Sequence, residues 1–242
     1  MINIPVLIGV PLNLDELKDG MLTVVDGFRD FTIGCTARTQ FLSEIIRKLV
    51  AIHPNLHPRI LTLPSTQILN RVEEGTVHIA LGLKTNIKKN SLIYRELNKI
   101  PAICTFRKDH PFATKSSVLM EDIKAGKLIL YHPGTVSLEI VQLQNKLSES
   151  KKLSDLYFCD SEEAALILVQ AGLGVAVLPD IFTSDTLDTE NNFNNLKKCR
   201  ISDAGERSFG YYYKTLAGNK PLKDFIRLLK ETVNTHDSHI IK

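Results

Sequence analysis

The chain has 242 residues, of which 43% are hydrophobic and 24% are charged, the usual composition of a soluble globular domain. Its formal net charge of +3 is too small to indicate a nucleic-acid-binding surface by itself. The four cysteines form no C-x-x-C pair, which argues against a zinc site and is compatible with a reducing cytosol. They are Cys35, Cys104, Cys159 and Cys199.

The N-terminal stretch lacks the residue pattern expected of a targeting signal. Residues 1–10 are apolar but lack a basic flank, and Asp15 and Glu16 follow at once, so we predict no signal peptide. No stretch approaches the roughly 20 apolar residues of a membrane span. We therefore expect a cytoplasmic protein. Residues 1–30 as a whole are poorly patterned and are interpreted as an N-terminal segment or the remnant of a linker.

Strands and helices alternate in the first half of the chain. Alternating or continuous apolar runs predict strands, and apolar residues at helical spacing predict helices. In order, the predicted elements are a strand at 31–35, a helix at 41–50, a strand at 59–63, a helix at 68–74 and a strand at 77–81. This order implies a parallel sheet with right-handed crossovers.

The second half repeats the pattern in kind. A run from Asp160 to Glu163 has the form of a capping box and opens one helix. Residues 184–196 are rich in Asp, Thr and Asn and are predicted to form an exposed loop. The strands are predicted at 102–106, 128–131, 157–158, 175–178 and 209–213, and the helices at 120–125, 136–147, from 162 onward and at 222–229.

The run from Ala164 to Pro179 is the most informative of these segments. An apolar helix ends at Gly172, the chain turns within about two residues, and a buried strand then stops at Pro179. This helix–AGLG–strand–LP run resembles the effector-binding domain of LysR-type transcriptional regulators.

Further motifs in the right order carry the same resemblance, which covers residues 31–233. Residues 74–80 are similar to the family's G-x-L-D-L-A-I, with His78 where aspartate is usual. Residues 109–113 resemble its HPLA motif, and residues 53–56 resemble its YP-x-V turn. Ser43 stands where the family usually has proline.

The resemblance implies an α/β fold of two Rossmann-like lobes joined by two crossover strands, like a type II periplasmic binding protein. It places residues 31–105 and 209–242 in lobe I and residues 106–208 in lobe II, with crossings near 105–107 and 207–210. It also implies a homodimer or tetramer, in which the first helix of one subunit packs beside the AGLG helix of the other. The family's helix-turn-helix has no counterpart here. Either this chain is part of a longer protein, which is the interpretation we favour, or it is a sensor without a DNA-binding domain.

Ligands of open α/β sheets bind at the carboxyl ends of strands, where helix N-termini favour anions. The resemblance places these loops around one cleft, so we predict a site for a small anionic metabolite. Arg38 could hold an anion through two hydrogen bonds or could be a solvated surface residue. The threonines and serines could equally be ordinary N-caps. The candidate ligand residues are Thr36, Arg38, Thr39, Ser65, Thr66, Gly134, Thr135 and Ser161.

Other chemistry is less well supported by the sequence. Cys35 could sense oxidants, but a small packed residue is the favoured interpretation, and His78 on an apolar strand favours a satisfied core histidine over a ligand. His132, Ser137 and Glu139 form no G-x-S-x-G elbow. We expect no cofactor, no metal and no catalysis, and DNA contact only through an absent helix-turn-helix domain. The alternatives are a solute-binding protein of a transporter or an enzyme on the same fold.

Overall fold

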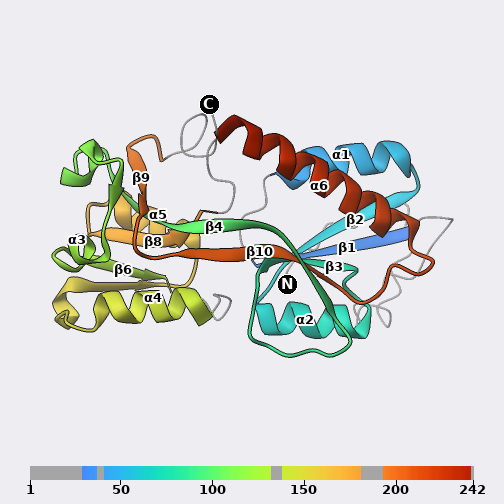
Figure 1. The fold of residues 1–242 in the computed structure, drawn as a ribbon, viewed down its shortest axis with the longest axis horizontal. Helices are drawn as coiled ribbons and strands as arrows, with labels where there is room; N and C mark the ends of the chain where they lie inside the picture. Colours follow the sequence, from blue (N-terminus) through green and yellow to red (C-terminus); the bar gives the residue numbers. More distant parts are fainter. Residues whose placement is uncertain (1–28, 37–40, 132–137, 181–192, 241–242) are drawn as a thin grey trace, which may run out of the picture.

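The fold consists of two mixed sheets that share one long strand (Figure 1). The computed structural model describes residues 29–36, 41–131, 138–180 and 193–240. Strands β4 (Ile93–Arg107) and β10 (Glu206–Tyr213) run side by side between the sheets. The two sheets, their flanking helices and the two linking strands confirm the predicted fold class.

The first sheet has the order β2-β1-β3-β10-β4. Strand β1 (Arg29–Cys35) is parallel to both β2 (Leu56–Thr62) and β3 (Ile79–Leu83), as the alternation of strands and helices predicts. Strand β10 is antiparallel to β3 and β4. Pro58 lies in β2 at the edge of the sheet, where a missing N–H costs no ladder hydrogen bond.

The second sheet begins where β4 changes partners. Pro101 is the last β4 residue opposite β10, and from Ala102 onward β4 pairs with β8 (Val175–Pro179). The other edge of the same β4 segment pairs with β9 (Leu196–Ile201), which also pairs with β5 (Ser117–Val118). Beyond β8 lie β6 (Leu128–Tyr131) and β7 (Leu156–Cys159), both parallel in direction to β8.

Helices cover both faces of each sheet. Against the first sheet, α1 (Leu42–Ile52) and α6 (Lys220–Ile240) lie on one face and α2 (Ser65–Glu74) lies on the other (Figure 1). Against the second, α5 (Glu162–Gln170) packs on one side, and α3 (Met120–Lys124) and α4 (Leu138–Ser148) pack on the other. Two short 3₁₀ turns, Pro111–Thr114 and Leu153–Asp155, complete the second half.

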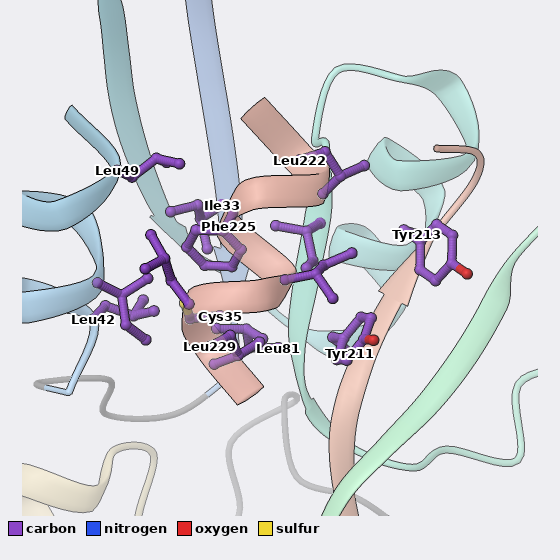
Figure 2. Close-up of a cluster of buried hydrophobic side chains, with 14 of the residues drawn as sticks. Ile33, Cys35, Leu42, Leu49, Leu81, Tyr211, Tyr213, Leu222, Phe225 and Leu229 are labelled. Atoms are coloured by element: carbon purple, nitrogen blue, oxygen red, sulfur yellow. The ribbon is translucent and has the colours of Figure 1, made fainter. Parts of the chain in front are cut away.

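The core of the first sheet is built from alternate residues of its strands. Figure 2 shows Ile33 and Cys35 of β1 and Leu81 of β3 converging with Leu42 of α1 and Phe225 of α6. The opposite face of β3 presents Ala80 to a separate cluster under α2. Strand β3 is therefore buried on both faces, as its continuous apolar run predicts.

Two predicted segments are wrong in part. Residues 184–192 of the predicted exposed loop lie outside the described residues, and Asn194 and Asn195 are exposed as expected. Residues 193–196 fall in the predicted exposed loop, yet Phe193 and Leu196 are only 8% and 2% exposed. They lead into β9, a strand that the sequence did not predict because Lys197, Lys198 and Arg200 mask its apolar positions. Strand β4 is also three times longer than expected. Its first part, from Ile93 to Lys99, is polar because it lies at the edge of the first sheet.

The helix α5 begins one residue later than a capping box over Asp160–Glu163 would require. Ser161 is the N-cap, and its Oγ accepts the N–H of Ala164 at 3.1 Å. The third helical residue is therefore Ala164, which has no side-chain acceptor, so the predicted cap is confirmed and the predicted box is wrong.

The AGLG segment owes its form to two glycines with different roles. Gly172 has φ +76°, and the N–H groups of Gly172 and Leu173 donate to the carbonyls of Val169 and Leu168. This is a Schellman termination of α5. Gly174 lets the chain approach β6 closely, because a Cβ there would lie 2.6 Å from the carbonyl oxygen of Lys127.

Replacing Gly174 by alanine should therefore destabilise the fold. The new methyl group would meet backbone rather than a flexible side chain, so the strands must separate, at a cost of about 1–3 kcal/mol. Urea unfolding should show this as a lower free energy of unfolding. Gly126→Ala is the matched control, because a Cβ there would meet nothing within 4 Å. Equal stability of the two variants would contradict the close-approach argument.

Candidate functional site

The carboxyl ends of the parallel strands β1, β2 and β3 meet at one edge of the first sheet. Thr36 follows β1, Thr66 lies in the first turn of the helix after β2, and Thr85 follows β3. Thr36 is half-buried, and its N–H donates to the carbonyl of Leu81 at 3.2 Å. The topology therefore brings three threonines from separate segments to the same edge.

A small recess opens between these segments. Thr36, Ile68, Gly82, Thr85 and Tyr212 are among the residues that line it. A Cβ on Gly82 would lie 2.5 Å from Thr36 Oγ1, so glycine leaves the room that this hydroxyl occupies. The cavity is about 10 Å³, roughly enough for one water molecule. It can anchor one polar group of a ligand but cannot enclose a metabolite.

Helix α2 begins near this edge without a side-chain cap, and the described residues, which leave out 37–40, show no side-chain cap for α1. The N-cap residues are Phe41 for α1 and Pro64 for α2, and neither makes a side-chain cap hydrogen bond. Ser65 and Thr66 are thus the first two helical residues of α2, and the interpretation of both as N-caps is wrong. Thr66 is exposed. First-turn N–H groups of a helix without a side-chain cap can bind an anion by donating hydrogen bonds to it.

The second sheet contributes a different helix start. Ser161 follows β7 and is exposed, and its hydroxyl is engaged in capping α5. The capping interpretation is thereby confirmed for this residue. Arg38, Thr39, Gly134 and Thr135 lie outside the described residues, as do His132 and Ser137. The structure therefore brings together Thr36 and the start of α2, and it places Ser161 on the other sheet.

A polar cluster between β4 and β10 was not predicted from the sequence. Tyr212 Oη accepts the N–H of Thr85 at 2.8 Å, which fixes the loop after β3. Tyr94 Oη and Ser208 Oγ lie 2.7 Å apart, and Ser208 Oγ donates to the carboxylate of Glu96. Burial raises the pKa of Tyr94 to about 12, so its hydroxyl stays neutral. The strand 209–213 was predicted, but its pattern could not show which hydroxyls meet across the strands.

Two histidines have clear structural roles. His78 Nδ1 accepts the N–H of Thr32 at 3.0 Å, and the His78 ring packs on Phe31 with centroids 5.4 Å apart. Burial lowers the pKa of His78. His78 is therefore a half-buried histidine at the margin of the core, and its Nδ1 is satisfied as expected. His53 Nε2 lies 2.9 Å from Asp224 Oδ2, and this hydrogen bond helps to lower the pKa of that carboxyl.

Within the described residues, no group of three or more His, Cys, Asp or Glu side chains could hold a metal ion. Cys35 is fully buried in the core of the first sheet, as expected of a small packed residue. None of the helices in this part of the chain is long and apolar enough to cross a membrane.

The two linked sheets, with helices that begin at the ends of their strands, define an α/β domain of the type II periplasmic-binding-protein-like fold class. The LysR substrate binding domain family matches residues 29–234, and the chain belongs to this family.

Similar proteins agree with this membership. YbhD, an uncharacterized HTH-type transcriptional regulator of Escherichia coli strain K12, is 26% identical over 152 residues, covering 62% of this chain and 47% of that protein. The chain spans about half the length of the curated relatives it matches. The effector-binding domain of a BenM variant has 17% identity and a TM-score of 0.69, covering 86% of this chain and 96% of that one. The effector-binding domain of QuiR in complex with shikimate has 13% identity and a TM-score of 0.66, with 86% and 99% covered.

The stability of the fold should depend on the protonation of His78. Because burial holds the pKa of His78 in the folded protein below its ordinary value of 6.5, the unfolded chain takes up the proton first as the pH falls. Above about pH 6.5 this group contributes no pH dependence. Below it, the free energy of unfolding should decrease until the folded-state pKa is reached.

His78→Asn offers the Thr32 N–H an amide oxygen that does not titrate, so the variant should lose this part of the acid slope. Chemical denaturation between pH 7.5 and 5 measures it. A His78 ring that titrates at or above pH 6.5 by NMR, or an unchanged slope in the variant, would contradict the argument.

Proposed function

We propose that this chain is the effector-sensing part of a LysR-type transcriptional regulator and that it binds a small anionic metabolite between its two lobes. The observation that carries the proposal is the start of α2 at the sheet edge, without a side-chain cap and beside the half-buried Thr36. Uncapped first-turn N–H groups and threonine hydroxyls are donors, and donors favour anions.

In this proposal residues 31–105 and 209–242 form lobe I and residues 106–208 form lobe II. The change of partners along β4, from β10 to β8 and β9, supports a division into two lobes. Lobe I would supply Thr36, Arg38, Thr39, Ser65 and Thr66 to the ligand. Lobe II would supply Gly134, Thr135 and Ser161.

The hypothesis of a regulator is favoured over those of a transport protein or an enzyme because the relatives are transcriptional regulators. The QuiR domain, similar in fold, was solved with shikimate, which supports testing carboxylates here. In the proposed protein, DNA contact belongs to a helix-turn-helix domain outside this chain, the protein acts in the cytoplasm, and ligand binding shifts a population of lobe arrangements.

Anion binding should stabilise the domain. A thermal-shift screen of small carboxylates, amino acids and inorganic oxyanions, with shikimate included, should give at least one hit. At one hundred times the dissociation constant, a ligand adds about 2.7 kcal/mol of stability, which raises the melting temperature by roughly 5–10 °C. Stabilisation by cationic or apolar compounds alone would contradict the proposed ligand class.

Thr36→Val and Thr66→Val should each weaken binding of the best anion about tenfold, because a hydrogen bond to a charged group is lost. Folding stability should change little for Thr66, which is exposed and caps nothing. Thr76→Val is the matched control. It removes an exposed threonine hydroxyl just beyond the C-terminal end of α2, so affinity should stay unchanged. Equal affinity in all three variants would remove this sheet edge from the site.

Exposed apolar side chains support the proposed dimer, in which α1 of one subunit packs beside α5 of the other. On the first sheet, Ile52 at the end of α1 and Ile60 in the edge strand β2 are 44% and 47% exposed. On the second, Phe158 in the edge strand β7 and Ile167 in α5 are 60% and 53% exposed. Phe158 and Ile167 also line an open hollow of about 540 Å³. Each lobe thus exposes apolar groups on one helix and on the strand at its outer edge.

Ile46 of α1 is half-buried and packs against the core of the first sheet. A charge there would disturb folding as well as assembly. Ile167 is the better probe because its side chain is accessible.

Ile167→Asp should weaken the dimer, shifting sedimentation at micromolar concentration toward the monomer. Burying an unpaired carboxylate in the interface is costly, while the exposed monomer surface tolerates it. Leu153→Asp is the control, since Leu153 is 75% exposed in the turn before β7. A dimer equally stable in both variants would exclude α5 from the interface.

A further inference from the structure

Two of the four cysteines lie directly opposite each other on neighbouring strands. In the antiparallel pair β4–β9, the register aligns Cys104 with Cys199. Residues aligned in this way project from the same face of a sheet, with Cβ atoms about 4.5–5.5 Å apart. Both side chains accordingly belong to the same buried cluster, the one beneath α3 and α4. A disulfide needs Cβ atoms about 3.5–4.5 Å apart, so only a small approach of the strands separates the two geometries.

The other two cysteines are in different surroundings. Cys35 lies in the core of the first sheet. Cys159 lies at the end of β7 against a third cluster, and its thiol donates to the carbonyl of Leu130 at 3.5 Å. All four cysteines are in the reduced form in the structure. Cys104 and Cys199 are therefore the pair whose positions match a disulfide.

We propose that Cys104 and Cys199 form a reversible redox pair, whose disulfide joins β4 to β9 when the protein meets a small disulfide oxidant. The two thiols and one oxidant RS–SR yield the Cys104–Cys199 disulfide and two RSH molecules. One thiolate attacks the oxidant and releases the first RSH. The other then displaces RS⁻ from the mixed disulfide, and this leaving group takes up a proton.

Cys199 is the thiol that reacts first. It is 6% exposed, whereas Cys104 is fully buried. Cys199 also faces the surface ion pair of Lys115 with Asp122, whose charged atoms lie 3.1 Å apart. Burial raises the pKa of Cys199 to about 11 and that of Cys104 well above its usual value. Because the thiolate is the nucleophile, exchange needs a local opening of β9 and is slow. The proposal therefore concerns the equilibrium between the dithiol and the disulfide, and not the rate at which the disulfide forms.

The position of the bond gives it a structural consequence. Strand β9 pairs only with β4 and the two-residue β5 among the described strands, and it leads directly into β10. A covalent link at Cys199 would hold β9 to the β4 segment that also pairs with β8. Oxidation would thus stabilise the second sheet next to the strands that connect it to the first.

The test compares the folded and the unfolded chain. The wild-type protein is brought to equilibrium in mixtures of reduced and oxidised glutathione, with and without denaturing urea, and starts from both the reduced and the oxidised form. After alkylation, the linked peptides are identified by mass spectrometry without reduction. In the folded protein, the Cys104–Cys199 disulfide should dominate over the five other pairings, with a midpoint at a glutathione ratio at least tenfold more reducing than in urea.

The single variants Cys104→Ser and Cys199→Ser should give glutathione adducts and no internal disulfide at this site. The oxidised wild type should melt several degrees higher than the reduced protein, and reductant should reverse the shift, because a bond favoured by folding favours folding equally. Equal midpoints in folded and unfolded protein, or dominance of another pairing or of glutathione adducts, would overturn the proposal.

Discussion

The whole architecture depends on one strand that belongs to two sheets. Strand β4 pairs with β10 as far as Pro101 and with β8 and β9 from Ala102 onward. Proline suits this point because it has no N–H to offer a ladder, while its carbonyl accepts the N–H of Asp180 at 3.0 Å. Gly210 permits an irregularity in the pairing of β10 with β4. A Cβ there would collide with the carbonyl oxygen of Arg95, and the register of the two strands shifts at this glycine.

The two strands that connect the sheets, β4 and β10, are also linked to the candidate site. Hydrogen bonds of Tyr94, Glu96 and Ser208 link β4 and β10 by side chains as well as by backbone. Tyr212, on the same strand as Ser208, holds the loop after β3 beside the recess. The segment that connects the sheets is thereby in contact with the candidate site. A ligand that contacts the loop after β3 would therefore also act on β10, which follows β9 of the second sheet in the chain.

The buried elements could be predicted from the sequence, and the exposed ones could not. The strand 128–131 was predicted with its observed bounds because all four residues are buried and apolar. The helix end at Gly172 was predicted because a left-handed residue there favours glycine. Strand β9 was not predicted because its charged residues lie between the buried apolar residues Leu196, Cys199 and Ile201, so the sequence shows no apolar pattern typical of a strand. For the site, strand ends located Thr36, but the uncapped start of α2 at Pro64 depends on backbone geometry that no residue pattern states.

The residues of the family motifs determine the local conformation of the backbone. In the HPFA segment, His110 Nδ1 accepts the N–H of Phe112 at 3.2 Å, and Pro111 opens the 3₁₀ turn. In the AGLG segment, one glycine ends a helix and the other admits a neighbouring carbonyl. His78, which stands where the family usually has aspartate, also satisfies a backbone group. Its neutral imidazole nitrogen accepts the Thr32 N–H as a carboxylate oxygen could. Since these motifs satisfy backbone groups, they identify the fold, whereas the proposed effector contacts lie in the loops at the strand ends.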